Sequence, residues 1–262
     1  MSRQPSLDGQ VAIVTGAGSK NSGLGTGKAV AVLLARQGAR VVLVDRHDDR
    51  AKETLEWIER EGGTATIVNV DLTEAASNQR VLDVALEQFG RIDILVNNAA
   101  VFSGTDVVNT TLEDFQETIA VNLTAAFLLC KGAIPAMVEV GGGSIVFITS
   151  ILAIRGPSPP AYAATKAALT GMAISIANSH GKQGIRANCI APGMIDTPMR
   201  SASIARSGID PAEVDATKHT SLGYGGDAWD VAHAVLYLVS PAGRYITGLH
   251  LPVDGGSATR LI

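Results

Sequence analysis

A tyrosine and a lysine four residues apart, Tyr162 and Lys166, are the side chains in this sequence best suited to proton transfer. Residues at positions i and i+4 of a helix lie on the same face, one above the other. A free tyrosine has a pKa of about 10 and is a poor base near neutral pH, but a neighbouring ammonium group favours the phenolate. Lowering that pKa by about 3 units takes about 4 kcal/mol, which close charges in a partly dry cleft can supply. The pair therefore predicts a tyrosine that acts as acid and base.

Two further polar residues stand where such chemistry could use them. Ser150 directly follows an apolar run at 144–149, and its hydroxyl could hold a substrate oxygen while Tyr162 exchanges the proton. Thr149, one residue earlier, is the alternative for this role. Asn122 falls inside an expected helix, where an amide is unusual because it competes with the backbone for hydrogen bonds.

A glycine-rich segment, residues 15–27, follows the first apolar run and precedes a helix-like stretch. Glycines let a backbone turn sharply, bring its N–H groups close to a pyrophosphate and aim the next helix N-terminus at that charge. The alternative interpretation is a flexible loop. Because the segment lies between an expected strand and an expected helix, it predicts a dinucleotide site.

The second apolar run ends at Asp45, whose carboxylate could accept hydrogen bonds from the adenosine ribose hydroxyls and repel a 2′-phosphate. Asp71 follows the third run and could lie beside the adenine. Either residue could instead be a solvated turn acid. Asp45 favours NAD over NADP, whereas Lys20 and Arg46 argue the other way because either could reach a 2′-phosphate.

These residues need a scaffold, and the apolar pattern predicts an α/β fold. Seven short β-rich runs alternate with amphipathic stretches of helical length, and continuous apolar runs suit a parallel sheet buried on both faces. The expected architecture is one Rossmann domain over 1–262, with a doubly wound seven-stranded sheet and helices on both faces. The runs lie at 11–15, 41–44, 66–70, 92–96, 144–149, 187–190 and 249–253.

Glycines and capping residues in the sequence predict where several helices begin and end. A helix over 28–36 should stop at Gly38, and another should begin near Thr110 or Thr111 with Glu113 and Asp114 as capping partners. A third should run over 160–180 and end at Gly181.

Composition narrows the function classes. The chain has 262 residues, 46% of them hydrophobic, with a net charge of −4 and a pI near 5.7. Without a basic footprint, nucleic acid is not an expected partner. Cys130 and Cys189 lie in apolar surroundings outside any metal-ligand pattern, so we expect two reduced thiols and no metal. Charged or glycine-rich turns interrupt the hydrophobic segments, and we expect a cytoplasmic protein with no membrane partner.

The order of these motifs resembles the short-chain dehydrogenase/reductase family, in its compact single-domain branch, over about residues 7–256. A Tyr-x-x-x-Lys pair is common by chance, but here it follows a strand that ends in Ser150 and lies within an ordered series. The matching motifs are Thr15-Gly16 with the following glycines, Asp71, Asn97-Asn98-Ala99, Asn122, Ser150, Tyr162-Ala-Ala-Thr-Lys166, Pro192-Gly193, Tyr245-Ile-Thr-Gly248 and Val253-Asp-Gly-Gly256.

This resemblance implies a catalytic set of Ser150, Tyr162, Lys166 and Asn122. In it Lys166 also bonds the nicotinamide ribose, Asn122 holds a water that links Lys166 to solvent, and the positive nicotinamide helps to lower the pKa of Tyr162. The expected cofactor-binding residues are Gly16, Ser19, Gly25, Thr26, Gly27, Asp45, Asp71, Leu72, Asn98, Ala99, Tyr162, Lys166, Pro192, Gly193, Ile195 and Thr197. The expected substrate-binding residues are Ser150, Leu152, Tyr162, Met194 and Met199.

The glycine loop departs from the family pattern TGxxxGxG, because extra residues lie around Lys20 to Leu24. Placing Gly25-Thr26-Gly27 on the GxG implies a five-residue insertion and keeps the register of the following helix. Placing Gly23-Leu24-Gly25 there implies a three-residue insertion and two extra residues at the helix start. The first alignment is preferred for its helix register.

The expected activity is hydride transfer between NAD(H) and a neutral secondary alcohol or ketone, with residues 7–195 as the core and about 196–226 as a substrate lid. The alternatives are an NADP-dependent ketone or 3-oxoacyl reductase, a non-catalytic dinucleotide sensor, and an enoyl reductase, whose Tyr and Lys are spaced more widely. Pocket candidates are mostly apolar, and we expect Arg155 to be a solvated loop residue. Family analogy and the apolar stretches 120–129 and 167–177 predict a homotetramer.

Overall fold

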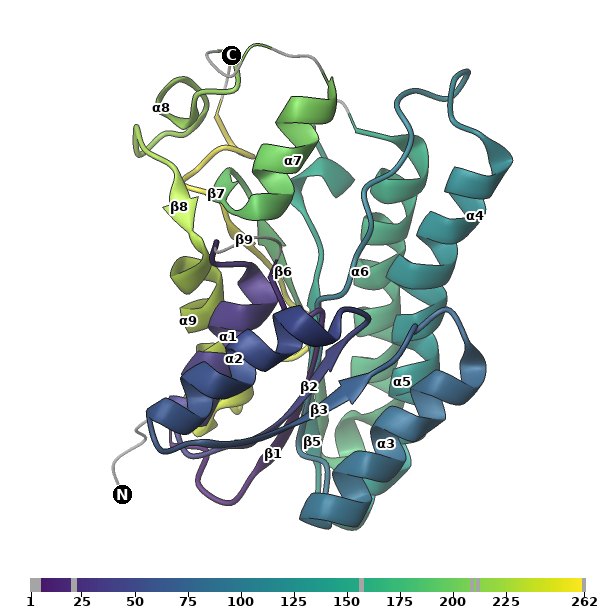
Figure 1. The fold of residues 1–262 in the computed structure, drawn as a ribbon, viewed down its shortest axis with the longest axis vertical. Helices are drawn as coiled ribbons and strands as arrows, with labels where there is room; N and C mark the ends of the chain where they lie inside the picture. The colour runs from purple at the N-terminus through teal and green to yellow at the C-terminus, as the bar shows by residue number, and fades with distance from the viewer. Residues whose placement is uncertain (1–5, 20–22, 156–157, 208–209, 211–212, 261–262) are drawn as a thin grey trace.

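In the computed structural model, which describes residues 6–19, 23–155, 158–207, 210 and 213–260, seven parallel strands form one sheet (Figure 1). The strand order β3-β2-β1-β4-β5-β6-β9 is that of a doubly wound Rossmann fold. The strands are β1 (Val11–Thr15), β2 (Arg40–Asp45), β3 (Thr64–Asn69), β4 (Ile94–Asn97), β5 (Gly143–Ile148), β6 (Ile185–Pro192) and β9 (His250–Val253). All seven predicted strands are present, with ends displaced by no more than a few residues.

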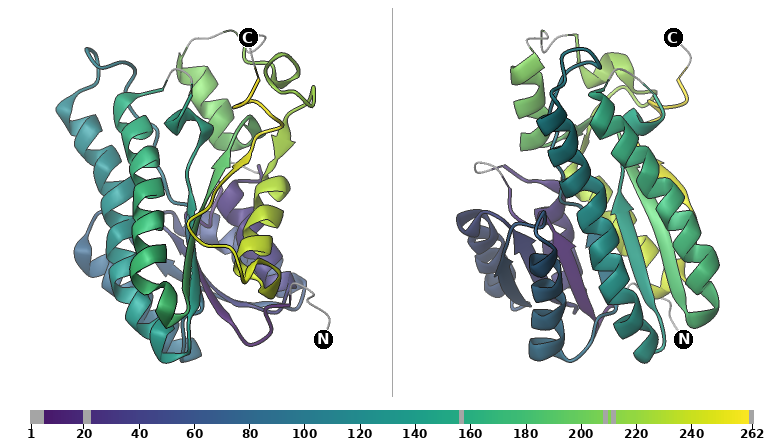
Figure 2. Two further views of the ribbon diagram at one scale, coloured as in Figure 1. Left: turned by 180° about the vertical axis from the view of Figure 1, so that it is seen from behind. Right: turned by 90° about the vertical axis from the view of Figure 1, so that its right-hand side faces the viewer.

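Helices cover both faces of the sheet (Figures 1 and 2). On one face lie α1 (Thr26–Arg36), α2 (Asp48–Arg60) and α9 (Ala228–Val239), and on the other α3 (Ala75–Phe89), α4 (Leu112–Ile119), α5 (Ala125–Glu139) and α6 (Pro160–His180). The central strands are buried against both layers, which explains why they read as unbroken apolar runs.

The predicted helix signals agree with the structure. Thr111 caps α4 by accepting a hydrogen bond from the Asp114 backbone N–H at 3.1 Å. Helix α6 begins at Pro160 and ends at His180, with Gly181 as its C-cap. Two short strands, β7 (Ile195–Asp196) and β8 (Gly226–Asp227), were not predicted, and they pair with each other outside the main sheet.

The run Leu112–Glu139 joins α4, a π-helical segment (Ala120–Thr124) and α5 into one continuous helix. By length and composition it could cross a membrane, with a mean hydropathy of 1.6 in its most apolar part, although Asn122, Thr124 and Lys131 interrupt its apolar residues. Its inner face packs into the core beneath the sheet through Leu129, Ala133 and Met137, as a core helix does. Its outer face leaves Phe127 51% exposed.

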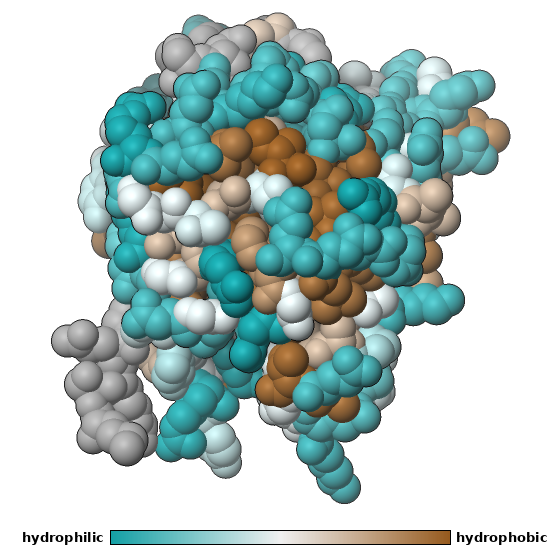
Figure 3. All heavy atoms as spheres, turned by 60° about the horizontal axis from the view of Figure 1, so that its bottom comes forward, coloured by the Kyte–Doolittle hydropathy of each residue, from teal (hydrophilic) through white to brown (hydrophobic). Residues whose placement is uncertain are grey.

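The strand order reverses between β1 and β4, and in open α/β sheets ligands bind at the carboxyl ends of the strands beside this reversal. Helices α7 (Pro198–Ser207) and α8 (Ala216–His219) lie above that edge (Figure 1). Figure 3 turns the opposite end forward, where hydrophobic residues gather in the middle and hydrophilic ones surround them.

Candidate active site

Tyr162 and Lys166 lie one turn apart on α6 and face the sheet. Both are almost fully buried, at 8% and 2% exposed. The Lys166 Nζ lies 5.6 Å from the centre of the Tyr162 ring and donates a 2.7 Å hydrogen bond to the Ile148 carbonyl at the end of β5. That bond anchors the ammonium group beside the phenol, so the geometry matches the predicted pairing.

The electrostatics of the pair differ from the prediction. Burial raises the pKa of Tyr162, and a side-chain hydrogen bond with Ser150 only partly opposes this. Burial also lowers the pKa of Lys166 to about 8. The predicted lowering of the tyrosine pKa is therefore wrong for the chain alone, because desolvation of the phenolate outweighs the opposing effect of Ser150.

Ser150 and Thr149 have different partners, and this separates the two candidates. The Ser150 Oγ accepts a hydrogen bond from the Leu152 backbone N–H at 3.1 Å, and the Ser150 side chain lies close enough to the Tyr162 phenol to lower its pKa. The Thr149 hydroxyl donates to the Ile190 carbonyl at 2.9 Å and lies 3.2 Å from the His250 Nε2. Thr149 therefore ties β5 to β6, whereas Ser150 points to the tyrosine.

Asn122 lies in the π-helical segment, a feature that often marks functional positions in helices. Its side chain binds the Val101 backbone twice, accepting from N–H at 2.8 Å and donating to the carbonyl at 3.0 Å. A cavity of about 10 Å³ lies between Asn122, Lys166 and Asn97, large enough for about one water. Within the part of the chain that the structure describes, the buried Asn97 Oδ1 has no hydrogen-bond partner, so a water there would satisfy it.

The glycine loop depends on glycine at two positions, one for its backbone conformation and one for a close approach. Gly16 has φ +62°, a conformation that L side chains rarely adopt, and a Cβ at Gly27 would lie 2.0 Å from the Gly16 carbonyl oxygen. Gly25 is the N-cap of α1, and Thr26 is its first residue. Gly25-Thr26-Gly27 thus occupies the strand-to-helix contact, which favours the five-residue insertion.

This loop also contains a polar atom that a phosphate or ribose could satisfy. The Ser19 Oγ is buried beside Gly25 at the start of α1 and has no hydrogen-bond partner among the described residues. A helix N-terminus with free backbone N–H groups and an unpartnered hydroxyl suits a pyrophosphate. The residues present therefore fit a dinucleotide.

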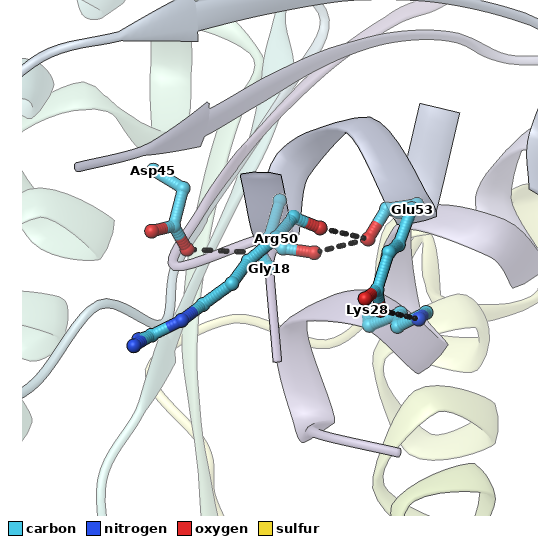
Figure 4. Close-up of polar contacts among 7 residues, drawn as sticks. Gly18, Lys28, Asp45, Arg50 and Glu53 are labelled. Atoms are coloured by element: carbon cyan, nitrogen blue, oxygen red, sulfur yellow. Dashed lines mark hydrogen bonds and ion pairs between the residues drawn. The ribbon is translucent and has the colours of Figure 1, made fainter. Parts of the chain in front are cut away.

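Asp45 lies at the end of β2, next to the glycine loop (Figure 4). Its carboxylate accepts hydrogen bonds from the Gly18 and His47 backbone N–H groups, each at 2.9 Å. Arg50 of α2 packs against the same loop, since a Cβ at Gly18 would lie 2.5 Å from the Arg50 Cβ. One carboxylate oxygen is held on the glycine loop and the other on the turn after β2, and both retain capacity to accept further hydrogen bonds.

Other predicted cofactor residues lie along the same edge. Asn98 donates from its side chain to the Thr15 and Gly16 carbonyls, at 2.9 and 3.1 Å, and the Ala99 N–H donates to the Thr15 hydroxyl. Leu72 lines the small cavity. Asp71 accepts from the Thr73 backbone and hydroxyl, which lowers its pKa, so its carboxylate also stabilises its own turn.

The segment after β6 is anchored from the C-terminal side. Gly193 donates to the Val253 carbonyl at 2.9 Å, and a Cβ there would lie 2.5 Å from the Asp254 Cβ. Pro192 ends β6, buried Ile195 begins β7, and the Thr197 hydroxyl accepts a long bond from the Arg200 N–H.

The predicted substrate residues are not gathered as closely as the catalytic ones. Leu152 lies beside Ser150, Met194 lines a separate cavity of about 460 Å³ under α7 and α8, and Met199 is 44% exposed. Phe102, which the sequence analysis did not single out, packs edge-on against Tyr162 with ring centres 4.7 Å apart. The sequence signal was an aromatic residue shortly after Asn97-Asn98-Ala99. Lys20 and Pro157, a further pocket candidate, lie outside the described residues.

Comparison with known proteins now identifies the family. A family model described as enoyl-(acyl carrier protein) reductase matches residues 18–258. A 2,5-dichloro-2,5-cyclohexadiene-1,4-diol dehydrogenase, LinX of Sphingobium indicum, is 36% identical over 253 residues, 95% of this chain and 96% of the relative. The chain belongs to the short-chain dehydrogenase/reductase family.

Solved structures of family members agree in fold. A 7α-hydroxysteroid dehydrogenase, complexed with NADH and 7-oxo glycochenodeoxycholic acid, has a TM-score of 0.89 and 34% identity over 100% of this chain and 99% of that one. A gluconate 5-dehydrogenase from Burkholderia cenocepacia, in complex with NADP and tartrate, has a TM-score of 0.89 and 30% identity, with 99% of each chain covered. The protein is a short-chain oxidoreductase that uses a nicotinamide dinucleotide and a small-molecule substrate.

Proposed function

We propose that the protein interconverts a neutral secondary alcohol and its ketone with NAD(H), and that Tyr162 is the acid and base. The observation that carries the proposal is the buried constellation at the end of β5. The Tyr162 side chain lies close to the Ser150 hydroxyl, which lowers its pKa, and beside an ammonium group anchored on the Ile148 carbonyl. Four-residue Tyr–Lys spacing favours this reaction over reduction of a carbon–carbon double bond.

Each side chain has a role that follows from its position. Ser150 orients the substrate oxygen, and Tyr162 donates a proton to it in reduction or removes one in oxidation. When bound, the nicotinamide supplies or accepts the hydride. Lys166 holds positive charge beside the phenol. The small cavity next to Asn122 has room for a water that would return a proton to Tyr162.

NAD is the preferred cofactor in this proposal. The Asp45 carboxylate is held at the glycine loop, where it would repel a 2′-phosphate and bond ribose hydroxyls. Arg46 could bind that phosphate, but its Nε donates to the His47 ring at 3.2 Å. A higher kcat/KM with NADP(H) than with NAD(H) would contradict this assignment.

The substrate is proposed to be neutral and moderately hydrophobic, because the cation nearest Ser150 along the chain is already occupied. Arg155 Nη1 donates to the carbonyls of Ser257, Ala258 and Arg260, at 3.0, 3.0 and 2.6 Å. The expectation that Arg155 is solvated is wrong. Its guanidinium is nevertheless already engaged and is not free to pair with a charged substrate. A substrate carboxylate near Ser150 would be poorly paired, at a cost of several kcal/mol. LinX, whose name specifies a cyclic diol, supports a neutral cyclic alcohol.

Two larger features belong to the same proposal. Residues 196–226, with α7 and α8, would serve as a substrate lid over the carboxyl edge (Figure 1). The protein would act as a homotetramer, since the side chains of Phe127 on α5 and Ile174 on α6 leave apolar surface exposed, at 51% and 46%. We place it in the cytoplasm. A monomer in light scattering at micromolar concentration would contradict the assembly.

The decisive experiment replaces Tyr162 with Phe, which keeps the ring packed on Phe102 and removes the exchangeable proton. We expect turnover to fall by at least about a thousand-fold while the Kd for NADH stays within a few-fold. A panel of cyclic alcohols, ketones and hydroxy acids, followed by nicotinamide absorbance, supplies the substrate. Substantial turnover by Tyr162→Phe would refute the assignment.

A further inference from the structure

The C-terminal turn, residues 254–260, lies between the loop that carries Ser150 and the segment that follows α8. Asp254 builds the turn by accepting backbone N–H groups of Gly256 and Ala258 at 3.0 and 2.7 Å. The Arg260 N–H closes it onto the Gly256 carbonyl at 3.1 Å. The turn therefore has a defined shape and presents its last carbonyls on one side.

Arg155 binds that carbonyl side. It lies on the short loop after Ser150, where its own N–H donates to the Ile151 carbonyl at 2.9 Å. Its guanidinium donates to the carbonyls of Ser257, Ala258 and Arg260, which lie about a hundred residues later in the sequence. Arginine donors at the carbonyl end of a helical turn offset its negative charge, so this contact stabilises both the loop and the turn.

The other side of the turn binds the lid segment. The Ser221 and Leu222 N–H groups donate to the Gly255 carbonyl at 2.8 and 3.1 Å. Arg260 Nη1 donates to the carbonyls of Lys218 and Thr220 at the end of α8. A Cβ at Gly256 would lie 2.8 Å from the Ser221 Oγ, which shows how closely the two segments pack.

We infer that Arg155 and Arg260 are positioning residues of the substrate site, which they hold through this turn. The inference rests on the proposed function for the identity of the two walls. One wall is the loop beginning at Ser150, and the other is the end of α8 with the residues that follow it. Neither arginine needs to touch substrate. Each fixes one wall to a shared support, so that the two walls keep a defined position relative to each other.

The test uses Arg155→Met and Arg260→Met, which keep an unbranched apolar stem but remove the donors, with exposed Arg244→Met as the matched control. In the full-length enzyme we expect the KM for a neutral cyclic alcohol to rise about ten-fold in Arg155→Met and less in Arg260→Met. We expect kcat and the Kd for NADH to change less than about two-fold. Because both arginines act through one turn, the double variant should be less impaired than the product of the single effects.

A second readout does not depend on turnover. Hydrogen exchange at the Ser221 and Leu222 amides, whose acceptor is the Gly255 carbonyl, should accelerate in both variants and stay unchanged in Arg244→Met. Unchanged exchange and KM would overturn the inference. A KM increase in Arg155→Met confined to hydroxy acids would also overturn it, since Arg155 would then bind substrate charge directly. Neither result depends on Tyr162→Phe, whose activity tests the proposed function separately.

Discussion

Replacing Lys166 with Met should abolish turnover and yet stabilise the fold at neutral pH. The lysine is 2% exposed, and burial lowers its pKa from 10.5 to about 8. A shift of this size means that keeping the ammonium charged in the folded state costs about 3 kcal/mol at pH 7. Met removes that cost but leaves the Ile148 carbonyl without its donor, a loss of about 1–2 kcal/mol. The net expectation is a gain of about 1–2 kcal/mol in the free energy of unfolding.

The pH dependence separates this explanation from improved packing. The unfolded chain binds more protons than the folded one between pH 8 and 10.5, so the cost is complete below pH 8 and is relieved as pH rises through that window. The advantage of Lys166→Met should therefore shrink by about 1 kcal/mol between pH 7 and pH 9. Burial raises the pKa of Cys130 and Cys189 to about 12, so both thiols stay protonated in the folded protein between pH 7 and pH 9. The Lys166 charge lowers the pKa of Cys189, so its removal leaves that thiol protonated over the same range.

The assay is reversible denaturant unfolding followed by circular dichroism, at one protomer concentration because assembly shifts apparent stability. Exposed Lys182→Met is the control and should give the same stability as wild type within about 0.5 kcal/mol at both pH values. The reasoning fails if Lys166→Met is less stable than wild type at pH 7. It also fails if the difference is equal at the two pH values.

Three further outcomes follow from contacts at the site. Ser150→Ala should lower kcat by about a hundred-fold or more with little change in the free energy of unfolding. Thr149→Val should lower the free energy of unfolding by about 1–2 kcal/mol, because it loses its bond to the Ile190 carbonyl, and should leave kcat within a few-fold. Steady-state kinetics and unfolding curves distinguish the pair. Gly27→Ala should lower the Tm and weaken NADH binding, because its Cβ would meet the Gly16 carbonyl; a variant with native Tm and affinity would contradict this contact. Asp45→Ala should raise kcat/KM for NADP(H) relative to NAD(H), and an unchanged ratio would show that the carboxylate does not select the cofactor.

Most of the fold was predictable because its signals are local. The parallel strands are buried on both faces, so each reads as an apolar run wherever it lies in the sheet. The ends of α6 follow from Pro160 at its first position and Gly181 as its C-cap. The spacing of Tyr162 and Lys166 likewise needs only helical periodicity. The two-residue strands β7 and β8 carry no such pattern, because a pair that short has no measurable period.

Contacts between segments distant in sequence were not predictable in the same way. The loop sequence around Arg155 indicates a surface turn, but its partners lie about a hundred residues later and are backbone carbonyls, which every residue possesses. The raised pKa of Tyr162 depends on how completely the fold excludes water from α6, which residue type alone does not reveal. Phe102 became recognisable only once its ring was seen against Tyr162.

Energetically unfavourable groups mark the same edge of the sheet without reference to any relative. Among the described residues, the buried side-chain polar atoms that lack a hydrogen-bond partner belong to Ser19, Asn78 and Asn97. Ser19 follows β1, Asn97 ends β4, and Asn78 lies in the first turn of α3, where its amide nitrogen reaches the Leu72 carbonyl. The buried ammonium of Lys166 lies at that edge too. Unpaired polar groups and a desolvated charge lower stability, so a core selected only for stability would not collect them in one place. Their common position at the carboxyl ends of the strands is therefore best explained by ligands and water that bind there.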